Sequence, residues 1–247
     1  MVLFDRIKNI FVRLFCFKQN GSYRIFYFCG IKFSKKISTN KVFLKSNETL
    51  VPCKKIKNLK ININGNNNTI IIDGTTVFKH SSILIENDNC SINIGRNNLL
   101  GVKIRMSRGD GQKIEIGDNN TLHSVSMVCD ETSSIKIGNN NLISAMINIW
   151  ASDGHSIIDR QNKDILNPCG HIEIGNHNWI SEDVRFTKNA KIKDDVVVGA
   201  GSLLTKSFNE SNIVLAGNPA KIIKNNIEWT EINPYHLGIL RGEKDVK

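Results

Sequence analysis

A row of apolar residues at six-residue steps constrains the fold of this chain more than any other feature. Its members are Ile174, Ile180, Phe186, Ile192, Val198 and Leu204. The residues between them are mostly Gly, Ala, Ser, Asn, Asp or Lys. A period of six is neither the helical 3.6 nor the alternation of a long strand. It is typical of a three-sided coil of short strands, in which one aliphatic side chain per side points inward. The row therefore predicts a parallel β-helix.

An Ile-x-Ile phrase followed by Gly and Asn recurs along the chain, starting at Ile61, Ile92, Ile114, Ile135 and Ile172. Apolar rows at six-residue steps follow several copies: Ile94, Leu100 and Met106; Ile116, Leu122 and Val128; Ile137, Ile143 and Ile149. Asn and Gly suit corners because they accept positive φ. The glycines closing the phrases are 30, 22, 21 and 37 residues apart. Three sides of six residues would give about 18. We therefore expect irregular early coils with insertions, and two clean coils from residue 172.

The 37-residue interval contains a long insertion over residues 150–171. It reads Trp150-Ala-Ser-Asp-Gly-His155, and Asp159 follows shortly after. Loops that project from a rigid scaffold often carry function. We therefore expect the active site on this loop.

Positive charge is concentrated in the N-terminal part of the chain. Residues 1–60 hold 14 Lys and Arg against 2 Asp and Glu, a net +12, whereas the other 187 residues hold 19 against 21, a net −2. Such a segment suits an anionic polymer or a membrane surface, and equally a solvated flank. Helical spacing of apolar residues predicts an amphipathic helix over residues 2–17, packed on the protein or lying in a membrane interface. The aromatic run Tyr23–Phe33 predicts the first strands.

The cysteines have neither a CxxC pair nor a disulfide-framework spacing: they are Cys16, Cys29, Cys53, Cys90, Cys129 and Cys169. We expect reduced thiols in a reducing compartment. Asp5, Arg6 and Lys8 interrupt the first apolar run, which argues against a signal peptide. No stretch approaches the roughly 18 apolar residues of a membrane span. We expect a cytoplasmic protein, with contact of residues 1–18 at the inner membrane face left open.

Four ordered motifs give the chain a resemblance to a known family. They are Ser152–His155 with Asp159, Ile172–Ile180, Val197–Lys206 and Ala216–Lys221. Over residues 60–229 the chain resembles the hexapeptide-repeat O-acetyltransferases, in the branch that modifies capsule, O-antigen and sialic acid polymers. The spacing of His155 and Trp179 is similar to that in polysialic acid O-acetyltransferases. The resemblance implies a left-handed coil, an exception to the right-handed crossover rule. It also implies a homotrimer with active sites between subunits.

The resemblance further implies which residues act on the acceptor. His155 matches the catalytic histidine of the family, and a histidine can take a proton from a sugar hydroxyl near neutral pH. Asp153 or Asp159 would orient its imidazole or hold the loop. Trp179 would face the site and stack on a sugar or on the pantetheine arm.

Two further roles are open in the sequence. Asn148 and Ser152 are candidates to donate hydrogen bonds to the oxyanion of the tetrahedral intermediate. A covalent acyl-enzyme is disfavoured because no cysteine lies in the matching motifs, although Cys169 lies in the loop. We expect direct transfer.

The resemblance implies acetyl-CoA as acetyl donor and no metal. Tiny side chains would let the donor approach the main chain, and lysines would meet its phosphates as point charges. The expected contacts are Ser181, Gly199, Ala200, Gly201, Ser202, Lys206, Asn218, Lys221 and Lys224. Residues 220–225 are expected to form a short capping helix.

The acceptor predicted from these features is a glycan, neutral or anionic, rather than a nucleic acid. N-acetylation of a nucleotide amino-sugar and a non-catalytic β-helix scaffold remain as alternatives. A zinc enzyme would need clustered ligands from His80, His123, His155, His171, His177 and His236, whose spacing does not favour one. The expected divisions are a basic segment over residues 1–59, an acetyltransferase domain over 60–215 and a cap and tail over 216–247.

Overall fold

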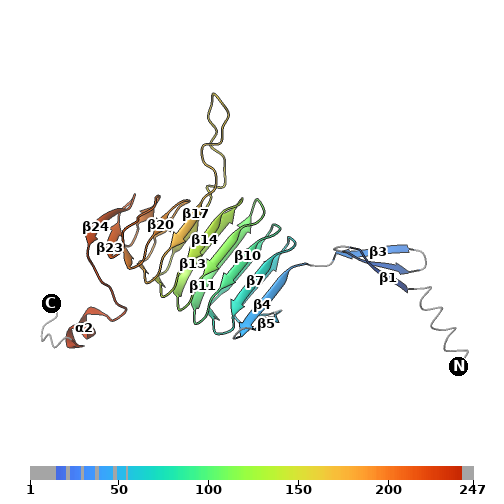
Figure 1. Cartoon of the computed structure of the whole chain (residues 1–247), viewed down its shortest axis with the longest axis horizontal. Helices are drawn as coiled ribbons and strands as arrows, with labels where there is room; N and C mark the ends of the chain where they lie inside the picture. The colour runs from blue at the N-terminus through green and yellow to red at the C-terminus, as the bar shows by residue number, and fades with distance from the viewer. Residues whose placement is uncertain are drawn as a thin grey trace, which may run out of the picture.

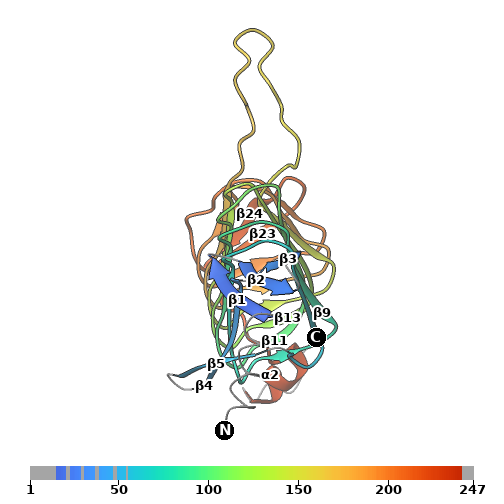
Figure 2. The same cartoon turned by 90° about the vertical axis from the view of Figure 1, so that its right-hand side faces the viewer.

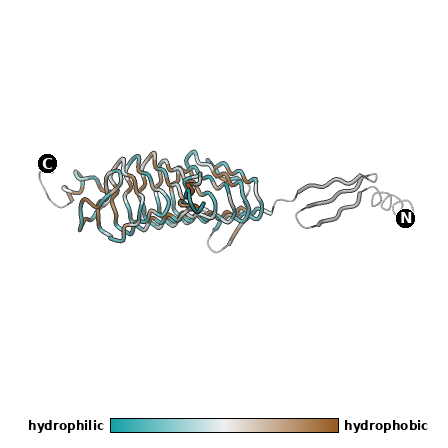
Figure 3. The backbone as a smooth tube through the Cα atoms, turned by 90° about the horizontal axis from the view of Figure 1, so that it is seen from above, coloured by the Kyte–Doolittle hydropathy of each residue, from teal (hydrophilic) through white to brown (hydrophobic). Residues whose placement is uncertain are grey.

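The computed structural model describes residues 15–20, 23–28, 31–36, 39–46, 49–53 and 55–240. Most of them form a parallel β-solenoid of about seven turns with almost no helix (Figure 1). The predicted β-helix is therefore confirmed. Figure 3 shows apolar and polar residues alternating along the coils, as a stack of coils with a packed apolar interior requires.

The first wall of the solenoid is a sheet of eight strands. Neighbouring strands in this sheet are parallel, except for one antiparallel pair at an edge. From that edge the strands are β5 (Thr49–Pro52), β4 (Lys41–Ser46), β7 (Thr69–Asp73), β10 (Ser91–Ile94), β12 (Lys113–Ile116), β14 (Ser134–Ile137), β17 (His171–Ile174) and β20 (Lys191–Ile192).

A thirteen-stranded sheet supplies the other two walls. The second wall contains β8 (Val77–Phe78), β15 (Leu142–Ile143), β18 (Trp179–Ile180), β21 (Val196–Val198) and β23 (Ile213–Ala216). The third wall contains β6 (Leu59–Ile63), β9 (Ser81–Ile85), β16 (Ile147–Trp150), β19 (Arg185–Phe186) and β22 (Leu203–Leu204). Two longer strands, β11 (Leu99–Ser107) and β13 (Thr121–Asp130), run from the second wall into the third.

The six-residue row forms the centre of the core. All six of its members, from Ile174 to Leu204, are buried. The upstream rows are also buried, with one exception: Val128 is half-buried and its neighbours Met127 and Cys129 point inward instead. The pairing of β11 with β13 shifts register between Leu100 and Val102. An extra residue in a strand reverses which side chains face inward, so a strict six-residue step fails there.

The early coils are longer than the late ones but stack in register, contrary to the expectation of irregular coils. Ile72, Ile94, Ile116 and Ile137 occupy equivalent places in the first wall, at intervals of 22, 22 and 21 residues. The phrase at Ile61 is not equivalent to the other four copies, because it lies in β6 of the third wall and pairs with β9. The 30-residue interval from Gly65 to Gly95 therefore compares positions after strands of two different walls.

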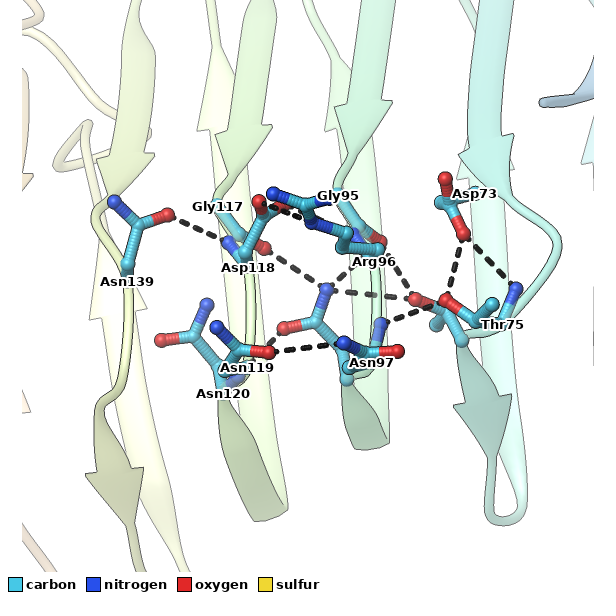
Figure 4. Close-up of polar contacts among 12 residues, drawn as sticks. Asp73, Thr75, Gly95, Arg96, Asn97, Gly117, Asp118, Asn119, Asn120 and Asn139 are labelled. Carbon is cyan, nitrogen blue, oxygen red and sulfur yellow. Dashed lines mark hydrogen bonds and ion pairs between the residues drawn. The ribbon is translucent and has the colours of Figure 1, made fainter. Parts of the chain in front are cut away.

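A column of buried asparagines joins the coils at the corner between the first and second walls: Asn98, Asn120, Asn141 and Asn178. Each Oδ1 accepts the backbone N–H of the residue stacked on it, at 2.7–2.9 Å. Asn120 Nδ2 also donates to Gly138 O at 2.9 Å. A second column runs beside it, in which Arg96 N–H donates to Asp118 Oδ1 and Asp118 N–H donates to Asn139 Oδ1 (Figure 4). The corners are therefore fixed by side chains as well as by strands.

The N-terminal part of the chain agrees with one expectation and differs from another. β1 (Phe15–Asn20), β2 (Tyr23–Phe28) and β3 (Ile31–Lys36) form a separate antiparallel sheet, which confirms the predicted strands. The helix expected over residues 2–17 lies largely outside the described residues, and its last part is strand β1 instead.

The C-terminal cap is a strand rather than the expected helix over residues 220–225. β24 (Lys221–Asn225) pairs antiparallel with the edge of β23. Its consecutive β-branched residues, Ile222 and Ile223, favour a strand, and the open edge of β23 supplies the partner. A short helix, α2 (Pro234–Leu240), follows. Within the described part of the chain, no helix is long and apolar enough to cross a membrane.

We predict that Asn120→Ala destabilises the solenoid by at least about 2 kcal/mol, because it leaves Gly138 O and Asn141 N–H buried without partners, at about 1–3 kcal/mol each. Chemical denaturation followed by circular dichroism measures this loss. Asn119→Gly is the matched control, since Asn119 is exposed with φ 58° and glycine accepts that conformation. An equal loss in both variants would contradict the role assigned to the buried column.

Candidate functional site

A long loop projects from the solenoid between β16 and β17, as expected for the insertion at residues 150–171 (Figures 1 and 2). Its outer part is a narrow hairpin in which Leu166 N–H donates to Ile157 O at 2.8 Å and Ile158 bridges Ile165. These four apolar side chains are 54–61% exposed. An apolar hairpin so exposed on a single chain is a candidate surface for contact with another protein chain.

His155 lies at the base of this loop, beside a cavity of about 200 Å³. Its side chain is exposed, and its imidazole makes no hydrogen bond or ion pair with any residue in the described part of the chain. The cavity is lined by Arg105, Arg108, Val128, Asp130, Trp150, Ser152, Asp153, Gly154 and His155. A free imidazole beside a cavity is available to exchange a proton with a bound hydroxyl.

Asp153 holds the base of the loop. Its Oδ2 accepts hydrogen bonds from Lys188 Nζ at 2.7 Å and from Asn167 Nδ2 at 2.9 Å. Asn167 Nδ2 also donates to His155 O at 2.8 Å. The Lys188 ammonium and, secondarily, the Asn167 amide hold the pKa of the Asp153 carboxyl below its usual value. Hydrogen bonds therefore hold the loop both at Asp153, before His155, and at Asn167, after it.

Neither candidate aspartate contacts the imidazole. Asp159 instead accepts the backbone N–H groups of Gln161 and Asn162 at 2.7 and 3.0 Å, which forms the turn of the hairpin. Of the two roles left open for these aspartates, the contacts favour holding the loop.

The oxyanion candidates lie in different places. Ser152 lines the His155 cavity, and its Oγ donates to Glu131 Oε1 at 3.3 Å and accepts Gly154 N–H at 3.1 Å. Asn148 lies outward on β16 and lines a separate groove of about 740 Å³ at the corner between the second and third walls. The structure therefore brings Ser152, but not Asn148, into the same cavity as His155.

Trp179 lies on β18, in the second wall, and does not line the His155 cavity of its own chain. Its indole is 6.2 Å from that of Trp229. Trp229 in turn stacks on His177 at 4.5 Å and donates its Nε1–H to His177 O at 2.7 Å. His177 Nδ1 pairs with Asp195 Oδ1 at 2.7 Å. The segment after β24 therefore folds back and supports Trp179, which the sequence pattern did not reveal.

The residues expected to bind acetyl-CoA divide into two groups. Gly199, Ala200 and Gly201 form the corner after β21, and a side chain at Gly201 would meet nothing within 4 Å. The main chain is open to a ligand there, beside Ser181, whose N–H bonds Val198 O. Ser202 is buried, and its Oγ donates to Gly199 O at 2.5 Å, so it maintains the corner.

The expected phosphate-binding lysines lie near the end of the solenoid. Lys206 and Lys221 line one cavity of about 260 Å³, together with Glu210. Lys224 and Asn218 are exposed and line none of the described cavities. Two ammonium groups in one exposed cavity fit an anionic group such as a phosphate.

Neither a metal site nor a cysteine nucleophile emerges at the loop. No cluster of three or more His, Cys, Asp or Glu suited to a metal occurs among the described residues. Cys53, Cys90, Cys129 and Cys169 are free thiols. Burial raises the pKa of Cys129 to about 12, so this thiol is inert. Cys169 lies half-buried with its Sγ 3.5 Å from Thr132 Oγ1 and does not line the His155 cavity.

The chain is similar to two solved enzymes over most of its length. The crystal structure of the polySia-specific acetyltransferase NeuO matches with a TM-score of 0.70 and 30% identity, covering 79% of this chain and 87% of that one. The polysialic acid O-acetyltransferase OatWY matches with a TM-score of 0.57 and 27% identity, covering 74% and 98%. No family model matches the sequence.

Two curated relatives match over shorter stretches. The galactoside O-acetyltransferase of Escherichia coli (strain K12) is 42% identical over 53 residues, 22% of this chain and 26% of that protein. The chloramphenicol acetyltransferase of Klebsiella aerogenes is 36% identical over 70 residues, 28% and 33% of the two. The chain thus spans about a quarter to a third of the length of the curated relatives it matches.

We predict that the loop base loosens in acid. Because the pKa of Asp153 is lower in the folded chain, its stabilising pairs are fully present above the unfolded pKa of about 3.9 and are lost as the pH falls through the folded value. Hydrogen exchange of residues 152–169, corrected for intrinsic rates, measures this. Asp153→Asn should loosen the base of the loop already at pH 7 and remove the share of the acid dependence that Asp153 contributes. The share from Asp159, whose pKa is lowered by the N–H groups of Asn162 and Gln161, should remain in the hairpin turn. Asp159→Asn, confined to the hairpin turn, is the control, and protection at pH 7 unchanged by Asp153→Asn would contradict the assignment.

Proposed function

Because this chain belongs to the hexapeptide-repeat O-acetyltransferases with a left-handed β-helix, we propose that it moves an acetyl group from acetyl-CoA to a sugar hydroxyl of a surface glycan. The observation that carries the proposal is the position of His155. A free imidazole lies beside a cavity at the base of a projecting loop, on a scaffold matched over 87% of NeuO.

His155 acts as general base in this proposal. Its imidazole takes the proton of the acceptor hydroxyl, whose oxygen then forms the new C–O bond. Acetyl-CoA supplies a thioester carbon activated for this attack, and its C–S bond breaks. The imidazolium returns its proton to the departing sulfur. A positioned base of this kind contributes about 10²–10⁴-fold. Ser152 is the nearest candidate to assist the oxyanion, since it lines the same cavity.

The proposed donor site is the corner of Gly199, Ala200 and Gly201, with Lys206 and Lys221 for phosphates. The open main chain at Gly201 and the shared lysine cavity support it. Asn218 lies beyond this corner and Lys224 lies on β24, and both would contact the donor at the margin of the site. Ser202 stabilises the corner through its hydrogen bond to Gly199 O.

We infer a homotrimer with sites between subunits. His155 and Trp179 lie on different walls of one chain, so a site that uses both needs a second copy. The exposed apolar hairpin of residues 157–166 supports such a contact. Reduced thiols support a cytoplasmic location.

The acceptor proposed is a sialic acid polymer or a glycan containing sialic acid, because NeuO is a polySia-specific acetyltransferase and OatWY is a polysialic acid O-acetyltransferase. N-acetylation of a nucleotide amino-sugar is the alternative. Acetyl-CoA turnover with sialic acid oligomers, neutral glycans and nucleotide amino-sugars separates the two. Thiol release with an amino-sugar alone would overturn O-acetylation.

We predict that His155→Ala lowers kcat for acetyl transfer about 10²–10⁴-fold, with the fold retained by circular dichroism. His171→Gln is a matched control, since His171 lies in the first wall and bonds Ser134. Thiol release measured with a chromogenic thiol reagent reports both. Turnover that survives His155→Ala would remove this residue as the base.

We also predict complementation between two inactive variants. Mixed trimers of His155→Ala and Trp179→Ala chains should regain measurable turnover, because some intersubunit sites then contain both native residues. Light scattering should give about 83 kDa, three times the 27.7 kDa of one chain. Mixed trimers with no turnover would place both residues from one chain in one site.

A further inference from the structure

We propose that Arg105 and Arg108 recognise the carboxylate of an acidic sugar beside His155. The inference rests on the proposed acetyl transfer and assigns the part of the site that selects an anionic acceptor. Both guanidinium groups line the same cavity of about 200 Å³ as His155 and Trp150.

The fold places the two arginines at the rim of this cavity from one strand and its end. Arg105 points outward from β11, and Arg108 follows the last residue of that strand. Arg105 is paired in register with Val128, which is paired with Trp150. Neighbouring strands lie about 4.8 Å apart, so Arg105 and Trp150 are separated by about 10 Å of rigid wall.

Arg108 is tied to the loop that carries the base. Its Nη1 donates to Gly154 O, adjacent to His155, at 2.6 Å. This bond fixes the guanidinium against the backbone that precedes His155, in the cavity that both residues line. A carboxylate held by the arginines would therefore place the rest of its sugar ring near His155.

The charges at the cavity leave the arginines incompletely neutralised. Both approach the same carboxylate oxygen, Asp130 Oδ2, at 3.9 and 3.8 Å, beyond hydrogen-bond distance. The other oxygen of Asp130 accepts Ser107 Oγ–H at 2.6 Å, and the Asp130 side chain is only 3% exposed. Both arginine side chains remain about half exposed, at 46% and 50%. One buried carboxylate thus faces two guanidinium groups that keep free N–H donors.

The second acid in the cavity does not occupy the N–H donors of the arginines. Asp153 lines the cavity, but its carboxylate is bonded to Lys188 at 2.7 Å. Lys188 on Asp153 and Glu131 on Ser152 add one charge of each sign, so three cations face three carboxylates. What the two arginines offer an acceptor is therefore their free N–H donors rather than an excess of positive charge. Arginine suits such a task because its planar fork matches a carboxylate in two parallel hydrogen bonds.

Trp150 completes the proposed acceptor surface. Its indole is half exposed and lies on the third wall, in the same cavity. An exposed indole offers an apolar face against which the carbon face of a sugar ring can pack. The acceptor chemistry that fits is therefore a sugar with both an apolar face and a carboxylate.

The test compares acceptors that differ only in charge. Arg105→Gln is the main variant, because Arg105 makes no bond to the loop, and Arg105→Lys keeps the charge but loses the fork. Arg185→Gln is the matched control, since Arg185 is exposed on the same wall and pairs with Asp183. kcat and KM are measured with a sialic acid oligomer and with the same oligomer after reduction of its carboxylates to alcohols. A uronic acid oligomer, which carries a carboxylate on a different sugar, shows whether the arginines select sialic acid or any acidic sugar.

We expect Arg105→Gln to raise KM for the sialic acid oligomer about 10-fold or more, because it removes a hydrogen bond between two charged groups. kcat and the KM for the reduced oligomer should change little. Arg105→Lys should lie between Arg105→Gln and the native chain, and Arg185→Gln should match the native chain. Equal changes in KM for charged and reduced oligomers would overturn carboxylate recognition while leaving acetyl transfer intact.

A binding measurement separates this inference from the proposed function. Saturation-transfer NMR of the sialic acid oligomer is recorded on His155→Ala protein with and without Arg105→Gln. A signal lost with Arg105→Gln supports recognition even if no glycan is acetylated. A signal of equal size in both proteins refutes it, whatever the activity.

Discussion

The structure depends on the hydrogen bonding that joins each coil to the next. Parallel strands provide it along the walls, and at the corner between the first and second walls buried Asn98, Asn120, Asn141 and Asn178 provide it with side-chain amides. Close stacking leaves little room there. A Cβ on Gly117 would lie 2.6 Å from Gly138 O, so only glycine fits between the coils. The result is a rigid prism on which each outward side chain has a fixed place.

A rigid prism distributes its outward side chains over separate walls, and this decides how a site can be built. His155 and Arg105 meet at the junction of the third wall with the loop, whereas Trp179 lies on the second wall. The proposed donor corner at Gly199 and the lysine cavity lie further along the solenoid. One chain carries the parts but does not close them around a single point. In the proposed trimer, association through the loop would complete such a site, because the walls themselves cannot bend.

The electrostatics of the loop base explain how an exposed segment is held. Asp153, Lys188 and Asn167 fix the two strands of the loop, and Arg108 binds the carbonyl of Gly154. These contacts leave the His155 imidazole free. They also leave Arg105 close only to a shared, buried carboxylate, so N–H donors of its guanidinium remain free in the cavity that His155 lines.

The sequence alone determined the β-helix, the row from Ile174 to Leu204 and the projecting loop with His155, because a period of six and an insertion are local properties that need no partner. It failed where register mattered. Ile61 lies in a different wall from the other copies of its phrase, and Val128 points outward after a register shift. β24 forms where a helix was expected. Each outcome depends on pairing with a strand that is distant in the sequence.

Only the tertiary structure decided what surrounds His155. Arg105 and Arg108 lie 50 and 47 residues before His155 and belong to no sequence motif. Trp229 reaches His177 and Trp179 only because the chain folds back after β24. Stacking of coils brings residues about 20 or more positions apart into contact, and the varying coil lengths hide that correspondence from any fixed period.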